Sequence, residues 1–267
     1  MRWNVLSAAA LMATATIHAR AAPASIAGRG DNGFDDLYGF SDALAEYYSL
    51  VSRHIYNTNR DSMPVCDLSK AELPSQASGL PAVPAGQNLV YVAIGRGTQN
   101  YTCSESSSSV GPSPIGALAT LFDASCLAAN FPDLLTTTIK VVLNYQGPNL
   151  PSTLPPANVA MLGHHYFSNN TTPVFAFDSA PPGRGGMAVT RKIKQMTAPA
   201  GSVPGQGNKG FGAVPWLYLQ TIAGTTNNYM SVYRVNTMGG SPPTNCKGIS
   251  GVFTIQYAAA YFIFSEG

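Results

Sequence analysis

The order of hydrophobic and polar positions predicts one helix near the start of the chain. Between residues 35 and 57, apolar side chains recur at steps of three and four, the spacing of one helix face: Leu37, Phe40, Leu44, Tyr47, Tyr48, Val51 and Ile55. Asp35 and Asp36 stand near the start, where the helix dipole favours acidic residues. The polar face carries no basic cluster, which favours a helix packed on a sheet over a helix that binds membranes.

From residue 88 onward the pattern is that of strands separated by turns. The predicted strands span residues 88–94, 98–103, 115–122, 136–145, 159–167, 173–178, 214–223, 229–235 and 252–264, with the run MAVTRKIKQM at 187–196. Residues 252–264 are apolar on both faces, as expected of a strand in a sheet that is covered on both sides. Only one helix is available to cross over between strands. The pattern therefore predicts an all-β fold, a mainly antiparallel sandwich or barrel, with one N-terminal helix.

The N-terminus adds a targeting segment. Arg2, an apolar run at residues 5–17 and the small-x-small sequence Ala19-Arg20-Ala21 form the pattern of a secretory signal peptide. We therefore expect a signal peptide at 1–22, a leader, helix and irregular segment at 23–86, and a β domain at 87–267. No other run approaches the roughly 20 apolar residues of a membrane helix. The expected location is extracellular or in the cell wall, without a membrane span.

Cysteine usage agrees with secretion. An even number of cysteines lies in the predicted mature part, and no two form a CxxC pair: Cys66, Cys103, Cys126 and Cys246. This indicates two disulfides rather than a zinc site. Of the three possible connectivities we favour Cys103–Cys246 with Cys66–Cys126.

Three sequons for N-glycosylation fit the same compartment: Asn100, Asn169 and Asn170. The last two overlap, so we expect at most one of that pair to carry a glycan.

Charge divides the chain into two parts. Only 10% of the residues are charged, and no acidic residue lies between Asp178 and Glu266. The basic run Arg191, Lys192 and Lys194 is a candidate surface for anionic glycans or a membrane surface, and the alternative is a solvated strand face. No aromatic residue interleaves this run, and secretion also argues against nucleic acid as a partner.

Trp216 is a candidate binding residue of another kind. An exposed tryptophan forms a stacking platform for sugars, whereas a buried one belongs to the core. The sequence does not separate these two roles.

Candidate catalytic residues are few. Asp123 and Asp178 end apolar strands, and His164 and His165 stand side by side. Glycoside hydrolysis usually needs two carboxylates, which makes these aspartates the weak candidates for such a reaction. Adjacent strand residues point to opposite faces, so the two imidazoles do not readily share a metal. We expect one histidine to be hydrogen-bonded inside the sheet and the other to face outward or into a cleft, with no metal and no cofactor.

The glycines at 95 and 97 suggest a dinucleotide fingerprint at first sight. Asn100 replaces its third glycine, however, and a strand follows where a helix is required. We therefore expect Gly95 and Gly97 to serve a bulge or a tight bend.

An ordered set of motifs runs from residue 89 to residue 264: VYVAIGRGTQNYTC, ALATLFDASCL, LGHHYF, VPWLYL and YRVNTMGGSPPTNC followed by YAAAYFIF. These motifs resemble the DUF3455 family of secreted fungal proteins with bacterial relatives. The resemblance implies no catalytic residues, because the family has no established activity. We expect a non-enzymatic surface or cell-wall protein that binds a polysaccharide or a host extracellular component. The alternative is a carbohydrate-active hydrolase that uses Asp123 or Asp178 with His164 or His165.

Overall fold

The computed structural model describes residues 32–57, 65–145 and 152–267, and the predicted signal peptide lies outside them. The helical elements are α1 (Asn32–Asn57), η1 (Leu68–Lys70), η2 (Ser75–Gly79), α2 (Ser125–Asn130), α3 (Pro132–Leu143) and η3 (Gln206–Asn208). The strands are β1 (Gln87–Cys103), β2 (Ser113–Asp123), β3 (Thr153–Leu154), β4 (Val159–Asn169), β5 (Thr172–Ala176), β6 (Met187–Met196), β7 (Trp216–Thr221), β8 (Tyr229–Gly239) and β9 (Gly251–Glu266).

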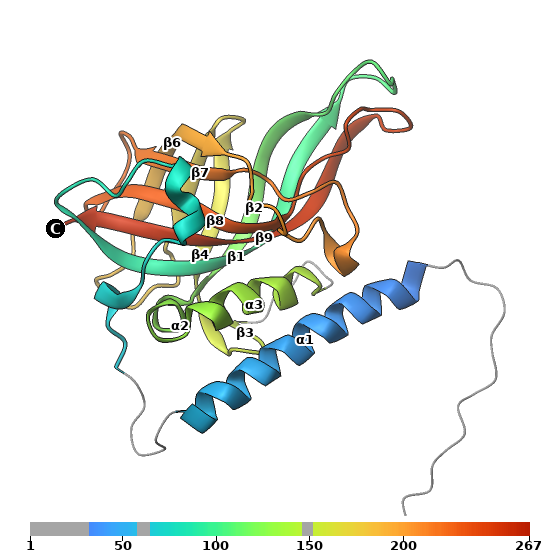
Figure 1. Ribbon diagram of the computed structural model, residues 1–267. Helices are drawn as coiled ribbons and strands as arrows, with labels where there is room; N and C mark the ends of the chain where they lie inside the picture. Colours follow the sequence, from blue (N-terminus) through green and yellow to red (C-terminus); the bar gives the residue numbers. More distant parts are fainter. Residues whose placement is uncertain (1–31, 58–64, 146–151) are drawn as a thin grey trace, which may run out of the picture. The chain divides into compact units, whose positions relative to one another are not determined.

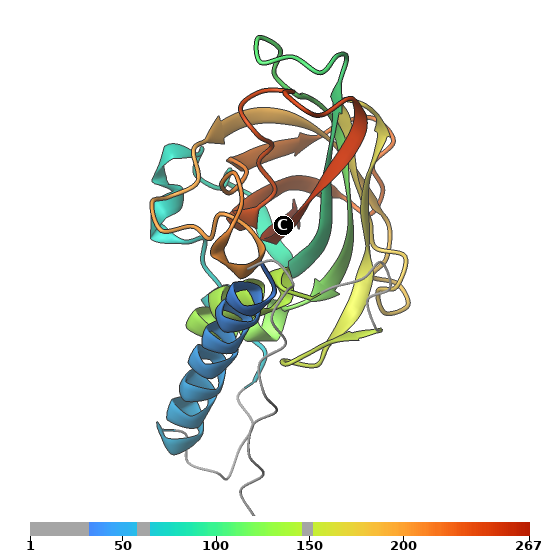
Figure 2. The same cartoon turned by 90° about the vertical axis from the view of Figure 1, so that its right-hand side faces the viewer.

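The strands form an antiparallel barrel. Neighbours follow in the order β2-β1-β9-β8-β7-β6-β5-β4, and pairing of β2 with β4 closes this set of 8 strands into a ring. The short β3 pairs with the first two residues of β4, Val159 and Ala160. Figures 1 and 2 show the strands wrapping around a common interior. Of the two architectures that the sequence leaves open, the structure has the barrel.

The predicted helix at 35–57 lies within α1, but it is not alone. The predicted strand at 136–145 is wrong, because these residues belong to α3 and the residues after it. Its β-branched side chains favour a strand, whereas Pro132 in the first turn, Asp133 near the start and Lys140 near the end favour a helix. Burial at helical spacing decides between them, since Leu135, Ile139 and Val142 share the face toward the barrel.

Helices α2 and α3 cover part of the outer wall of the barrel. Leu135 and Ile139 of α3 belong to one buried cluster with Val92 and Ile94 of β1 and Phe262 of β9. The alternate residues of β9 point into the barrel, where Tyr257, Ala259, Tyr261 and Ile263 are buried. The two apolar faces of β9 are thus explained, and the prediction of a strand covered on both sides is confirmed.

Helix α1 packs on α3, as Figure 1 shows. Tyr47 and Leu50 are buried against the face of α3 that carries Leu134 and Val141. An ion pair and a histidine–carboxylate hydrogen bond flank this contact: Lys140 Nζ lies 2.9 Å from a carboxylate oxygen of Glu46, and His54 Nε2 lies 2.9 Å from Asp133 Oδ1. Across the described ranges, no helix combines the length and the apolar character needed to cross a membrane.

The strands predicted at 88–94 and 98–103 are one strand, β1, whose pairing shows no register shift at Gly95 or Gly97, so a bulge at these glycines is wrong. These glycines instead permit close approach. A Cβ on Gly97 would lie 1.9 Å from the backbone oxygen of Leu118 in β2, and a Cβ on Gly95 would lie 2.5 Å from the ring of Tyr261. A side chain at either position would clash with a neighbouring strand, β2 or β9, which would have to move away from β1.

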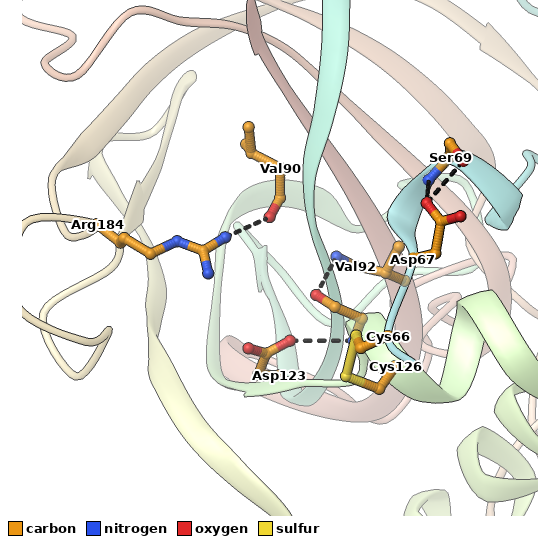
Figure 3. Close-up of a disulfide and its surroundings, with 9 residues drawn as sticks. Cys66, Asp67, Ser69, Val90, Val92, Asp123, Cys126 and Arg184 are labelled. Carbon is orange, nitrogen blue, oxygen red and sulfur yellow. Dashed lines mark hydrogen bonds between the residues drawn. A yellow bond between two sulfur atoms is a disulfide. The ribbon is translucent and has the colours of Figure 1, made fainter. Parts of the chain in front are cut away.

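Two disulfides fasten the segments around the barrel. Cys66 pairs with Cys126 and ties the chain before η1 to α2, which Figure 3 shows in close-up. Cys103 pairs with Cys246 and ties the end of β1 to the loop between β8 and β9. The pairing favoured from the sequence is confirmed.

Candidate functional site

The two adjacent histidines lie on opposite sides of the barrel wall. His164 is partly exposed on the outside, and its Nδ1 lies 2.9 Å from a carboxylate oxygen of Asp178. His165 is 2% exposed inside, where its Nδ1 bonds the carbonyl of Val174 at 2.9 Å and its ring stacks on Phe175. Burial lowers the pKa of His165 to about 4, so its imidazole is neutral near pH 7. The alternation that the sequence predicts for this pair is confirmed.

Asp123 has a local role at the end of β2. Its carboxylate accepts a hydrogen bond at 3.0 Å from the backbone N–H of Ser125, at the start of α2 (Figure 3). The Ser125 hydroxyl in turn accepts one from the N–H of Val92. The structure thus pairs Asp178 with His164 and uses Asp123 to shape a turn. In the described ranges, no three His, Cys, Asp or Glu side chains gather as metal ligands.

Of the predicted binding residues, the basic run is exposed and Trp216 is not. Arg191, Lys192 and Lys194 are exposed on β6. Trp216 is 3% exposed and belongs to the buried cluster between the barrel wall and its covering helices. As the first residue of β7 it points away from the barrel interior, so a role as a surface platform for sugars is wrong.

A cavity of about 440 Å³ lies at one end of the barrel. Residues of β1, β2, β4, β5, β6, β7 and β8 line it, together with the β4–β5 turn and the segment before β7. Much of the lining is apolar and includes Phe167, Val214, Leu217 and Leu219. The polar side chains that line it are Gln99, Tyr101, Asn170, Thr171, Lys192, Gln195 and Arg234. Within this described lining no residue is acidic.

Arg234 is the buried charge of this cavity. It lies in β8 opposite Leu217 of β7 and Tyr261 of β9, and it is 8% exposed. Its Nη2 donates a hydrogen bond at 2.9 Å to the carbonyl of Pro215. Its Nε has no hydrogen-bond partner in the part of the chain that the structure describes. None of the three ion pairs found there includes this guanidinium.

A second buried arginine shows how this fold satisfies a structural guanidinium. Arg96, 4% exposed on the outer side of β1, donates at 2.8 Å to the carbonyls of Val142, Tyr145 and Gly97. The side chain of Gln256 accepts a further hydrogen bond from it. Burial lowers the pKa of Arg96 to about 10. These bonds attach the end of α3 to the barrel and leave Arg96 saturated, which Arg234 is not.

Polar side chains continue from the cavity into the barrel. The hydroxyls of Tyr257 and Tyr261 lie 2.9 Å apart. Burial raises the pKa of both phenols, and the charge of Arg234 opposes that rise. Gln99, which lines the cavity from β1, has a side-chain nitrogen without a partner among the described residues. Two unpartnered donors, on β1 and β8, thus belong to one cavity.

Arg234 lies in the region of the sequence without acidic residues, but that composition alone does not single it out. The signal lies in the strand YMSVYRV, where Val232 and Arg234 share a face and both neighbours of Arg234 are apolar. A charge on the inward face of a strand is costly unless a partner satisfies it, and for that reason it points to a site.

Comparison with known proteins gives a family and no function. Residues 84–265 match the model described as "Protein of unknown function (DUF3455)", and this range includes the barrel, α2 and α3. Residues 10–81 match a second model, "Protein of unknown function (DUF2990)". No curated protein matches the chain, and no solved structure matches it. Because the first match spans most of the sequence and all the residues of the cavity, the chain belongs to the DUF3455 family.

Proposed function

We propose that this protein is a secreted, non-enzymatic binding protein that holds a small amphiphilic molecule at the mouth of its barrel. The observation that supports this most is the cavity beside Arg234, which combines an apolar lining with unpartnered buried donors. Small-molecule sites have this composition and a volume of about 300–1,000 Å³. Closed barrels of this strand number either fill their interior with side chains or hold one small ligand. The signal-peptide pattern and the two disulfides support secretion.

A hydrolase has less support. The pair formed by His164 and Asp178 is exposed to solvent, with 43% and 50% of the two side chains accessible. The catalytic acid of a glycosidase lies in an apolar pocket, whereas this pair faces solvent. Asp123 is engaged at its turn, and the lining of the cavity supplies no carboxylate.

Polysaccharide binding is the second candidate. The exposed bases on β6 favour it, since Arg191, Lys192 and Lys194 present positive charge on one strand. The buried position of Trp216 removes one source of the stacking contacts that neutral glycans use.

The test titrates the protein from residue 23 onward with N-phenyl-1-naphthylamine, a neutral dye whose fluorescence rises in apolar sites. We expect saturable binding of one dye per chain. Leu217→Trp fills the cavity and should weaken binding at least tenfold. The matched control is Leu118→Trp, because Leu118 of β2 is 56% exposed and does not line the cavity.

The absence of saturable binding, or equal binding by Leu217→Trp, would rule the proposal out. Incubation with insoluble chitin, β-glucan and cellulose distinguishes the other functions. Depletion of the protein from solution supports polysaccharide binding, and release of sugar supports a hydrolase.

A further inference from the structure

Resting on the proposed function, we infer that the molecule held at the barrel mouth is an organic acid with an apolar body, and that Arg234 binds its carboxylate. The inference adds the chemical class of the ligand and the residue that selects it. It follows from the charge, the free donors and the lining of the cavity.

The first step concerns charge. A buried guanidinium needs an anionic partner or a full set of hydrogen bonds, because desolvation of an uncompensated charge costs several kcal/mol. Arg234 has neither from the described residues: it forms no ion pair, and its Nε lacks a partner. The sequence around it offers no carboxylate either, since residues 179–265 contain no acidic residue. An anion from outside the chain supplies the missing countercharge.

The second step concerns hydrogen-bond geometry. The bond from Nη2 to the carbonyl of Pro215 helps to hold the guanidinium in place and leaves Nε free to donate. A guanidinium presents its donors in a planar fork that matches the two oxygens of a carboxylate. Gln99 adds a second unpartnered donor from another wall of the same cavity. Lys192 adds positive charge to the lining, where its Nζ bonds the side chain of Gln195 at 3.0 Å.

The third step concerns the rest of the ligand. An inorganic anion would satisfy Arg234 and leave the apolar lining, including Phe167, Leu217 and Leu219, in contact with water. A sugar acid could bond to the polar side chains of the lining, but it would place hydroxyls against Phe167, Leu217 and Leu219, where no polar side chain satisfies them. A carboxylate with an alkyl or arylalkyl chain matches both parts of the cavity.

Arg96 provides the internal comparison. Where an arginine of this fold has a structural role, three backbone carbonyls at 2.8 Å accept its hydrogen bonds. Arg234 is buried to a similar extent, and it has one bond to a backbone carbonyl, that of Pro215, and one to the side chain of Tyr261. Arg234 therefore keeps a donor, Nε, that is available to a ligand.

The experiment measures displacement of N-phenyl-1-naphthylamine by decanoate and by decan-1-ol, which differ in the head group alone. We expect the wild-type protein to bind decanoate at least tenfold more tightly, the size of effect that a charge-assisted hydrogen bond produces. Arg234→Gln should reduce this preference to less than threefold while dye and decanol binding persist. The matched control is Arg191→Gln, an exposed base on β6 that does not line the cavity and should leave the preference unchanged.

The outcomes separate the two proposals. If the dye does not bind, the proposed function fails. If the dye binds but decanoate shows no preference over decanol, or Arg234→Gln keeps the preference, the present inference fails while the proposed function stands. Tighter competition by inorganic phosphate or glucuronate than by decanoate also overturns it. Should Arg234→Gln not fold, Gln99→Leu takes its place, and a threefold loss for decanoate without a loss for decanol is the supporting result.

Discussion

Replacement of Arg96 by methionine tests how α3 is held to the barrel. Methionine fits the length of the buried stem but removes every donor. Val142, Tyr145 and Gly97 then lose their hydrogen bonds at 2.8 Å from the guanidinium. At about 1.5 kcal/mol for each bond to a charged group, the loss amounts to about 4.5 kcal/mol. Relief from burying the charge offsets part of it, so we expect the free energy of unfolding to fall by about 3 kcal/mol.

Urea denaturation of the protein from residue 23 onward measures this change. Trp216 is the sole tryptophan of that chain, and its burial in the cluster beside α3 makes its fluorescence a direct report of unfolding. For a protein of this size the melting temperature should drop by about 6–12 °C.

The matched control is Arg234→Met. Since Arg234 has fewer bonds than Arg96 and its buried charge costs free energy, its replacement should leave the free energy of unfolding unchanged or raise it in the absence of ligand. A loss below 1 kcal/mol for Arg96→Met, or an equal loss for both variants, would refute the distinction between a saturated and an unsatisfied arginine.

Two further substitutions probe the barrel wall. His165 has a folded pKa of about 4 against about 6.5 when unfolded, so the unfolded chain binds more protons between these values. The free energy of unfolding should therefore fall by up to about 3 kcal/mol as the pH drops from about 6.5 to about 4. In urea titrations at pH 7 and 4.5, His165→Phe should remove this part of the pH dependence. If the variant keeps the same pH dependence as the wild-type protein, burial of His165 is not its cause. Gly97→Ala should cost more than about 3 kcal/mol or prevent folding, because its Cβ would meet Leu118 at 1.9 Å. Gly111→Ala is the control, with its nearest neighbouring atom at 3.8 Å, and equal expression and stability of the two variants would show that the close contact is unimportant.

The alternation of side chains along a strand predicts those features of the fold that depend on strand geometry alone. The two apolar faces of β9 and the opposite orientations of His164 and His165 follow from the strand period of two. The spacing of the cysteines, by contrast, leaves three disulfide connectivities open, and alternation along the strands does not decide among them.

Features that depend on partners distant in sequence could not be predicted. Residues 136–145 have β-branched side chains, and burial of one helical face against β1 and β9 overrides that preference. Closure into a barrel depends on pairing of Thr120 with His164, between strands separated by α2 and α3. The candidate site was missed for the same reason, since Arg234 becomes a buried charge only when β1, β7 and β9 surround it.

The order of strands around the barrel places β9, the last strand in the sequence, between β1 and β8, so the barrel cannot form completely until β9 has been synthesised. Strand β1 is synthesised first, yet one of its two edges pairs with β9, and Gln87 lies opposite Glu266. The backbone N–H of Gly267 donates a hydrogen bond at 2.8 Å to the carbonyl of Gly86, which extends the pairing of β1 with β9. A nascent chain that lacks β9 therefore exposes two open strand edges and the apolar interior between them, the conditions that favour aggregation. Strand β9, with 16 residues, is the last of the nine described strands to leave the ribosome, so its pairing is the closing step of folding. Premature termination within β9 should therefore be far more damaging than loss of α1.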